Sequence, residues 1–325
     1  MSLSAKSAWI TWEYQPRNIS MAKALGVQLH QLISNKPRLL KYAYLTIKTL
    51  PILLNRNIEV IFVQNPSIVL CTLAIAVAKP LGKKVIIDAH NAGIFPLEGR
   101  SKILNALCKW LFNRADLTIV TNSQISTYVS ENGGKPVIMP DPLPSFPTSN
   151  NFTPGNHFFL ICSWSDDEPY GTVIDAFRNM PDCTLKISGN YTKKLSKAYI
   201  ENLPDNIILC GFITRKEYEE TLASATAVID LTDREMCVLC GIYEGVAAEV
   251  PVITTPTTAI FEVFENHVYY TKSDQEDIIK ITKKITAIDR ISIYEKAIKA
   301  KKYIIKQQES RIDHIKNVVI NTLRT

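Results

Sequence analysis

The feature that most constrains this chain is an alternation between short apolar runs and helix-length segments, which extends over most of its 325 residues. In the first half, runs such as EVIFV and KVIID are apolar almost throughout. Strands of this kind are buried on both faces, as in a parallel sheet that helices cover on both sides. We therefore predict a parallel α/β sheet with strands at residues 8–12, 59–63, 84–88, 117–120 and 136–139.

The second half repeats this alternation after a break in composition. Residues 145–156 are rich in Pro, Ser, Asn, Thr and Gly, which is typical of a linker. We predict two domains, 1–150 and 151–325. An amphipathic tail at 291–323, with charges on one face and Ile, Val and Leu on the other, predicts long C-terminal helices. The second sheet is predicted to have strands at residues 157–162, 183–188, 206–209, 227–231, 251–254 and 267–270.

Composition excludes several protein classes. With 46% hydrophobic and 21% charged residues, the chain is neither disordered nor fibrous. Its longest apolar run, 68–78, is well short of the ~20 residues that a membrane-spanning helix needs. The first residues lack the pattern of a secretory signal, so a cytoplasmic location is expected. Seven cysteines, an odd number set mostly in apolar runs, favour reduced thiols over a disulfide framework.

The charge is unevenly distributed along the chain. Residues 1–150 contain 16 Lys and Arg against 7 Asp and Glu, although the net charge of the whole chain is only +6. An excess of this kind indicates an anionic partner, such as a lipid surface or a phosphate-bearing acceptor; the alternative is a solvated lysine-rich face without a partner. A nucleic-acid partner is not expected, because interleaved aromatic residues and a recognisable motif are lacking.

Two segments of the first half contain candidates for chemistry. Ligands of open parallel sheets bind beyond the carboxyl ends of the strands. Asp88, His90 and Asn91 follow such a strand, and a carboxylate beside a histidine is the arrangement that a general base needs. The alternative is a structural histidine. Arg17 and Asn18 lie where a loop leads into a helix whose start can bind an anion, unless Arg17 is merely an exposed helix-start residue.

The second half contains candidates for binding a nucleotide. After its first strand, the turn at Ser163 leads into a helix start that could hold a phosphate, if Asp166, Asp167 and Glu168 point away. Other candidates come just after strands, where glycine permits close approach of a ligand to the backbone: Gly189, Asn190, Gly211 and Phe212.

Residues 231–255 are the most informative stretch. We expect a helix to begin near Gly241, with Glu244 in its first turn, so that its N–H groups can face a pyrophosphate. Arg234 would add charge-assisted bonds, with Glu235 and Cys240 nearby. Glu244 would accept hydrogen bonds from ribose hydroxyls, or alternatively would only offset the helix dipole. The Cys-x-x-Cys pair that ends at Cys240 has no second pair, so no metal site is expected.

In the order and spacing of these segments, the chain resembles GT-B glycosyltransferases. The resemblance rests on FVQNPS, IIDAHNA, SGN, LCGF and CGIYEGVAAEVPV. The DAHN segment is similar to the Asp-Trp-His-Asn segment of lipid-linked chitobiose β-mannosyltransferases, and 241–252 resembles the glutamate helix of retaining family-four enzymes. The resemblance implies two Rossmann-like domains that face a central cleft, with Glu244 on the donor ribose and Asp88 or His90 facing the acceptor.

The chain departs from the retaining pattern at two positions. Met236 stands where that pattern has a second glutamate, with Glu235 one residue away, and Glu249 replaces the usual glycine before Pro-Val. We expect a metal-independent glycosyltransferase without a cofactor, which moves a sugar from a nucleoside-diphosphate sugar to a lipid-linked or surface-glycan acceptor. These departures motivate an alternative, a catalytically inactive nucleotide-sugar binding protein of GT-B type.

Residues 37–56 combine four basic residues with many apolar ones. A helix of this composition, interrupted near Pro51, would lie in the headgroup plane of an anionic membrane and hold the protein on its inner face. The alternative is that the same apolar residues pack on the first sheet.

Overall fold

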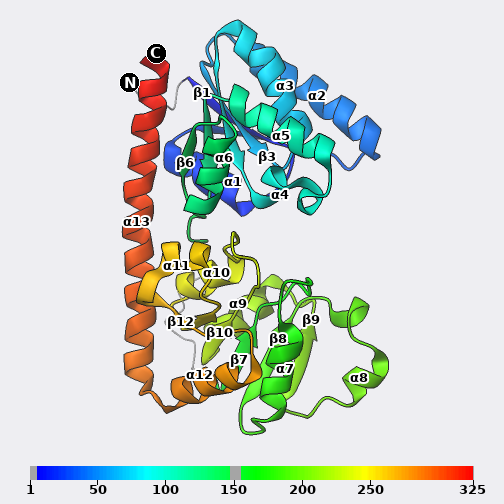
Figure 1. Ribbon diagram of the computed structural model, residues 1–325, viewed down its shortest axis with the longest axis vertical. Helices are drawn as coiled ribbons and strands as arrows, with labels where there is room; N and C mark the ends of the chain where they lie inside the picture. Colours follow the sequence, from blue (N-terminus) through cyan, green and yellow to red (C-terminus); the bar gives the residue numbers. More distant parts are fainter. Residues whose placement is uncertain (1–5, 147–154, 325) are drawn as a thin grey trace. The chain divides into compact units, whose positions relative to one another are not determined.

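The computed structural model describes residues 6–146 and 155–324, which form two compact units (Figure 1). Unit 1 contains the described residues up to Pro142 and those from Gln307 onward, and unit 2 contains those from Leu143 to Lys306. The predicted boundary after residue 150 falls outside the described residues. The sequence assigned all of the C-terminal tail to the second domain, whereas its last part belongs to unit 1.

Unit 1 is built on a six-stranded sheet in the order β2-β1-β3-β4-β5-β6, with all neighbours parallel. All five strands predicted in this half are present. The strand β2 was not predicted, because its four residues, QLHQ, lack the apolar character of a central strand and lie at the sheet edge. The strands are β1 (Ser7–Thr11), β2 (Gln28–Gln31), β3 (Val60–Asn65), β4 (Lys84–Ala89), β5 (Leu117–Val120) and β6 (Pro136–Ile138).

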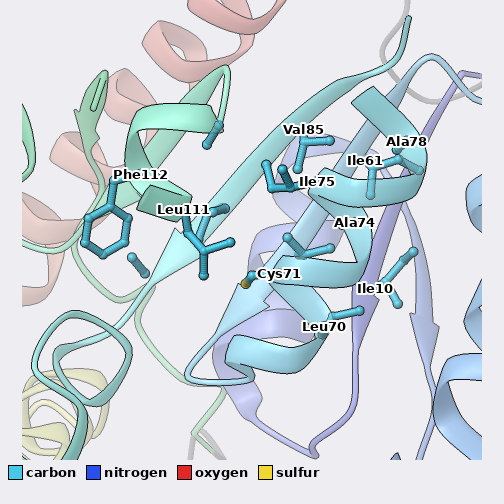
Figure 2. Packing of buried hydrophobic residues seen from close by; sticks show 14 of the residues in the cluster. Ile10, Ile61, Leu70, Cys71, Ala74, Ile75, Ala78, Val85, Leu111 and Phe112 are labelled. Atoms are coloured by element: carbon cyan, nitrogen blue, oxygen red, sulfur yellow. The ribbon is translucent and has the colours of Figure 1, made fainter. Parts of the chain in front are cut away.

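Helices cover both faces of this sheet. Along β1, Ile10 packs against the layer formed by α2, α3, α5 and α6, and Trp9 packs on the opposite face against α1 and the end of α13. Figure 2 shows α3 on the first of these faces, with Cys71 and Ala74 next to the strands. The helices are α1 (Pro16–Leu25), α2 (Arg38–Leu54), α3 (Ile68–Ala78), α4 (Asn91–Ile94), α5 (Lys102–Arg114) and α6 (Ser123–Glu131), with 3₁₀ turns at Lys79–Leu81 and Pro96–Gly99.

Unit 2 has a second six-stranded parallel sheet, in the order β12-β11-β10-β7-β8-β9. Its faces are covered by α7 and α12 on one side and by α9, α10 and α11 on the other. The strands are β7 (His157–Leu160), β8 (Thr184–Ser188), β9 (Ile207–Gly211), β10 (Ala227–Ile229), β11 (Val252–Thr254) and β12 (Tyr269–Tyr270). The helices are α7 (Tyr170–Arg178), α8 (Lys197–Glu201), α9 (Arg215–Ala223), α10 (Cys240–Ala247), α11 (Thr258–Phe264) and α12 (Gln275–Ala287), with 3₁₀ turns at Tyr191–Lys193 and Glu265–His267.

The last helix, α13 (Arg290–Arg324), belongs to both units. Ala300 and Ile304 are buried in unit 2, whereas Ile315 and Val319 are buried against the Trp9 face of the sheet in unit 1. This burial is the reason that the end of the tail belongs to unit 1. The predicted fold class, two α/β domains with parallel sheets and a long C-terminal helix, is confirmed.

Two further expectations concern thiols and membranes. All seven cysteines lie outside disulfides. Within residues 6–146 and 155–324, none of the helices combines the length and the apolar character needed to cross a bilayer.

Candidate functional site

Each sheet has two adjacent strands whose following connections lead toward opposite edges of the sheet. Ligands of open α/β sheets bind at the carboxyl ends of such strands. In unit 1 these strands are β1, which leads to the edge strand β2, and β3, which leads to β4. In unit 2 they are β7, which leads to β8, and β10, which leads to β11. Most of the predicted site residues follow these strands or their neighbours.

Arg17 and Asp88 form a buried ion pair in unit 1. The Arg17 Nε and Nη2 atoms donate to the two carboxylate oxygens of Asp88 at 3.0 and 2.8 Å. Nη1 donates to Asp141 Oδ1 at 2.7 Å, and Nη2 also donates to the Met139 carbonyl at 3.0 Å. The sequence placed Arg17 in a loop that leads into an anion-binding helix start or, alternatively, at an exposed helix start. Arg17 does lie at the start of α1, but it is buried and its guanidinium is already engaged.

This pairing fixes the charge of Asp88. Burial alone would raise the pKa of the carboxyl group, but the charge of Arg17, together with the contact to His90, outweighs burial and holds the pKa well below its ordinary value. Asp88 therefore stays ionised at neutral pH. A group with so low a pKa is a poor proton donor or acceptor, so Asp88 is better suited to positioning its neighbour than to acid/base catalysis.

That neighbour is His90, which lies just beyond the end of β4. Its Nε2 atom is 3.4 Å from Asp88 Oδ2, without the alignment of a hydrogen bond, and its side chain is 22% exposed. The His90 backbone N–H donates to the Asn65 carbonyl at 3.1 Å, which ties the end of β4 to β3. Asn91 begins the short helix α4 beside it and is half-buried. His90 is thus a partly accessible imidazole beside a fixed negative charge.

Asn18 does not lie at a surface where it could meet an acceptor. Its side chain accepts a hydrogen bond from Trp9 Nε1 at 2.9 Å and donates to Gln64 Oε1 at 2.8 Å. Gln64 Oε1 also accepts from the Thr11 hydroxyl. Three side chains of β1 and β3, those of Trp9, Thr11 and Gln64, therefore form a buried polar network with Asn18.

In unit 2, the turn after β7 closes on its own carboxylate. Glu168 accepts hydrogen bonds from the backbone N–H groups of Ser163 and Ser165 at 2.9 and 3.0 Å, and from the Ser163 hydroxyl at 2.8 Å. The sequence assigned the N–H groups of the helix start that follows this turn to a phosphate, if Glu168 points away. Glu168 instead points onto the turn, and the turn N–H groups bind a carboxylate of the chain itself, which is consistent with the general affinity of clustered N–H groups for anions.

The turns after β8 and β9 depend on glycine for two different reasons. A Cβ atom on Gly189 would lie 2.0 Å from the Cys162 carbonyl oxygen, so only glycine permits this approach of the two loops. A Cβ atom on Gly211 would make only an ordinary contact, 3.6 Å from the Tyr191 ring, but this residue adopts a φ of +66°, which favours glycine. Asn190 accepts from the Thr192 N–H and caps a 3₁₀ turn. Phe212 is 84% exposed, and its ring is available for stacking.

The helix α10 begins with Cys240, which is exposed, and Gly241, which is buried. The N–H groups of Gly241 and Ile242 donate to the buried carboxyl group of Asp230 at the end of β10. Burial, and then the nearby charges of Glu168 and Glu244, raise the pKa of Asp230 well above its ordinary value. The N–H groups that the sequence assigned to a pyrophosphate are therefore partly occupied by this side chain.

Glu244 lies in the second turn of α10, not in the first turn as predicted, so its charge does not serve to offset the helix dipole. Tyr218 on α9 donates its hydroxyl to Glu244 Oε2, the one side-chain hydrogen bond that Glu244 makes with the described residues. Burial raises the pKa of Glu244, whereas the Tyr218 hydroxyl and the charge of Arg215 act in the opposite direction. The side chain is half-buried and retains access to solvent.

The loop after β10 is connected to the turn after β7. Arg234 Nη2 lies 3.2 Å from Asp167 Oδ1, and about half of the Arg234 side chain is exposed. Thr232 donates its hydroxyl to Asp167 Oδ2 at 2.9 Å. Glu235 accepts from the N–H of Thr258, the first residue of α11, at 3.1 Å. Arg234 is therefore an accessible cation beside the turn that contains Ser163, whereas Glu235 caps a helix.

The roles of several residues in these sites were not predicted from the sequence. Asp230 was considered only as a metal ligand and set aside, although it ends the apolar run AVID as Asp88 ends VIID. Glu168 was expected to repel a phosphate unless it acts as a cap and points away, and it caps the turn. Tyr218 lies in the charged stretch RKEYEE, which gives no signal of its contact with Glu244. No group of three or more His, Cys, Asp or Glu in the described part of the chain is arranged to hold a metal ion.

Comparison with known proteins supports the fold. No family model and no curated protein sequence matches the chain. Among solved structures, HepE of Anabaena in complex with UDP and glucose is similar with a TM-score of 0.70 at 16% identity, over 98% of this chain and 99% of HepE. Sucrose-phosphate synthase of Thermosynechococcus elongatus has a TM-score of 0.70 at 13% identity, over 98% of each chain.

An enzyme of another kind is similar as well. UDP-GlcNAc 2-epimerase of Methanocaldococcus jannaschii has a TM-score of 0.56 at 13% identity, over 87% of this chain and 94% of the epimerase. These likenesses extend over both units and concern the fold of each. The chain therefore has the GT-B fold.

Proposed function

We propose that this chain is a glycosyltransferase, which moves a sugar from a nucleoside-diphosphate sugar to a hydroxyl group of an acceptor. The observation that carries the proposal is the partly exposed His90 imidazole beside the ionised Asp88 at the carboxyl end of β4. An imidazole held in this way is suited to accept the proton of an attacking hydroxyl group. The fold, shared with HepE in complex with UDP-glucose, supports the choice of a nucleotide-sugar donor.

The role of each group in unit 1 follows from its charge. One nitrogen of the His90 ring takes the acceptor proton, and the Asp88 carboxylate stabilises the imidazolium ion that forms. Arg17 keeps Asp88 ionised and is a positioning residue. The acceptor is a lipid-linked or surface glycan, a proposal that the basic charge of residues 1–150 supports because such acceptors carry phosphate.

Unit 2 is proposed to bind the donor. The Glu244 carboxylate accepts from the ribose hydroxyls, and the exposed Phe212 ring stacks on the base. Arg234 contacts the pyrophosphate, because Glu168 and Asp230 occupy the N–H groups nearby. We infer that transfer needs no divalent ion and that Arg234 stabilises the leaving diphosphate. Retention of activity in EDTA tests this step, and loss of activity that Mg²⁺ restores contradicts it.

A second candidate is a nucleotide-sugar binding protein without catalytic activity. The observation that favours it is that carboxyl groups of the chain occupy both groups of N–H donors, at Ser163 and at Gly241. These two functions differ in turnover and not in donor binding.

The experiment has two steps. A thermal-shift screen of UDP-, GDP-, ADP- and dTDP-sugars identifies the donor, because a ligand at 100 times its Kd adds ~2.7 kcal/mol of stability. Release of the nucleoside diphosphate is then measured with an extract of acceptors. We expect His90→Gln to lower turnover ~10²–10⁴-fold with donor affinity unchanged. The matched control is His314→Gln, which changes an exposed histidine on α13.

The outcomes separate the candidates. Donor binding without release of diphosphate in any extract supports the binding protein. Wild-type turnover in the His90→Gln variant would overturn the assignment of the base, and the absence of a thermal shift with every donor would overturn both functions.

A further inference from the structure

The helix α2 has two apolar stripes on different sides. Leu45 and Leu53 are fully buried in the core of unit 1, and this inner stripe is sufficient to hold the helix on the sheet. The helix continues through Pro51 to Leu54, so the predicted interruption is wrong. The outer stripe follows the helical spacing of three and four residues and consists of Leu40, Tyr44, Ile47, Pro51 and Leu54.

The outer stripe is exposed in the described part of the chain. Ile47 is 66% exposed, and Leu39, next to the stripe, is 85% exposed. The alternative that all the apolar residues of this segment pack on the first sheet therefore holds only for the inner stripe. A contiguous row of large exposed apolar side chains marks a surface that binds a partner or a membrane.

The segment that forms the outer stripe is basic, and Glu59, which lines a pocket with Leu54 and Arg56 at one end of it, is paired with Lys6. No acidic residue occurs between Glu13 and Glu59. Two basic side chains flank the exposed aromatic ring of the stripe: the Nζ atoms of Lys36 and Lys48 lie 5.5 and 5.8 Å from the centre of the Tyr44 ring. The basic residues of this surface are Lys36, Arg38, Lys41, Lys48 and Arg56, and none of them forms an ion pair with a described residue.

We propose that the outer stripe of α2 and its flanking basic residues are a docking surface for a lipid bilayer that contains anionic lipids. An amphipathic helix of this kind lies in the headgroup plane with its apolar side chains in the acyl boundary. Lys and Arg extend their aliphatic stems along the apolar surface and keep their charges at the level of the lipid phosphates. The row of aliphatic side chains on one helix suits a bilayer better than an acidic protein, for which aromatic anchors in pockets are typical.

The test is co-sedimentation of the full chain with vesicles of phosphatidylcholine, with and without phosphatidylglycerol. We expect binding only when phosphatidylglycerol is present, and release at 1 M salt, where the Debye length is ~3 Å. In the variant Arg38→Gln/Lys48→Gln, affinity should fall about 25-fold, since each basic residue near an anionic surface contributes about fivefold. The variant Leu40→Ser/Ile47→Ser should also lose binding, because it removes apolar contacts with the acyl region.

Matched controls change the same residue types elsewhere. Lys197→Gln/Lys216→Gln and Ile291→Ser alter exposed side chains in unit 2 and should leave vesicle binding unchanged. Thermal unfolding of all variants should match the wild type, because the substituted side chains are exposed.

Several results would overturn the proposal. One is wild-type protein that stays in the supernatant at every lipid composition, and another is equal binding by the wild type and the Leu40→Ser/Ile47→Ser variant. A third is a wild-type dimer that this variant converts to a monomer, because the stripe would then be a protein interface. The assay contains neither donor nor acceptor, so its outcome is independent of the proposed sugar transfer.

Discussion

The Arg17 guanidinium contacts two carboxylates in the interior of unit 1, and its removal would leave Asp88 buried without a partner charge. We expect Arg17→Met to destabilise the protein by about 3–5 kcal/mol, because an uncompensated buried charge costs that much. The measurement is urea unfolding. Lys23→Met, on an exposed position of the same helix, is the control and should change stability by less than about 0.5 kcal/mol. Equal stability of the two variants would contradict the importance of the pair.

The same pair gives a dependence of stability on pH. The pKa of Asp88 is depressed in the folded protein, whereas in the unfolded chain it is ordinary, near 3.9. The stability that the pair contributes is therefore fully present above pH ~4 and is lost as the pH falls further toward the depressed folded pKa. We expect the stability difference between wild type and Asp88→Asn to be constant from pH 5 to 8 and to shrink in stronger acid, in unfolding curves measured at each pH. A stability difference between wild type and Asp88→Asn that grows in acid would contradict a depressed pKa of Asp88.

Tyr218 controls the ionisation of Glu244. Its hydroxyl lowers the pKa of a carboxyl group that burial raises, so Tyr218→Phe should raise that pKa further. Since the ionised carboxylate is the form that accepts from ribose, we expect UDP affinity to decline on acidification in both proteins, beginning at a higher pH in the variant. Calorimetric titration between pH 5 and 8 measures this. Tyr199→Phe on α8 is the control, and superimposable pH profiles for Tyr218→Phe and wild type would contradict the role of Tyr218.

Among the elements, the loops of unit 2 show where glycine is needed. Gly189→Ala forces a Cβ atom against the Cys162 carbonyl at a φ of +83°, and we expect it to destabilise unit 2 by at least about 1 kcal/mol. Gly171→Ala, in the first turn of α7 with open space around the new methyl group, should instead stabilise by about 0.4–1 kcal/mol. Stability changes of opposite sign for the two variants, measured by thermal unfolding, would support the close packing of the loops at Gly189. A loss of stability in both variants would argue against it.

Some strands and helices could be predicted from the sequence, and others could not. Periodicity identified the buried strands, because an apolar run covered on both faces has few other uses. It missed β2, whose side chains are polar at the sheet edge, and it broke α2 at Pro51, although packing of Leu45 and Leu53 holds the helix together. At the candidate site, His90 and Asp88 could be paired from their spacing. The partner of Asp88, Arg17, lies 71 residues away, and only tertiary structure brings them together.

For the whole molecule, α13 supplies part of the core of unit 1. Ile315 and Val319 are buried beside Trp9 on the sheet face that α1 also covers. We expect Ile315→Ser to destabilise unit 1 by about 2–5 kcal/mol, the range for loss of a large buried side chain. The matched control, His314→Ser, changes the adjacent exposed position. The readout is native-state hydrogen exchange of β1 and β3, and unchanged protection in the Ile315→Ser variant would contradict this role of the helix.

The path of α13 also has a consequence for biosynthesis. Unit 2 is one continuous stretch of chain, so all of its residues have been made when translation reaches Lys306. Most of unit 1 precedes unit 2 in the chain, yet its Trp9 face lacks part of its cover until the residues after Lys306 have been made. Domains of a nascent chain generally fold from the N-terminus onward. Here the order of the two units is reversed: the unit whose chain begins before unit 2 is completed after it, and a chain truncated after Lys306 would expose part of the apolar face of that sheet.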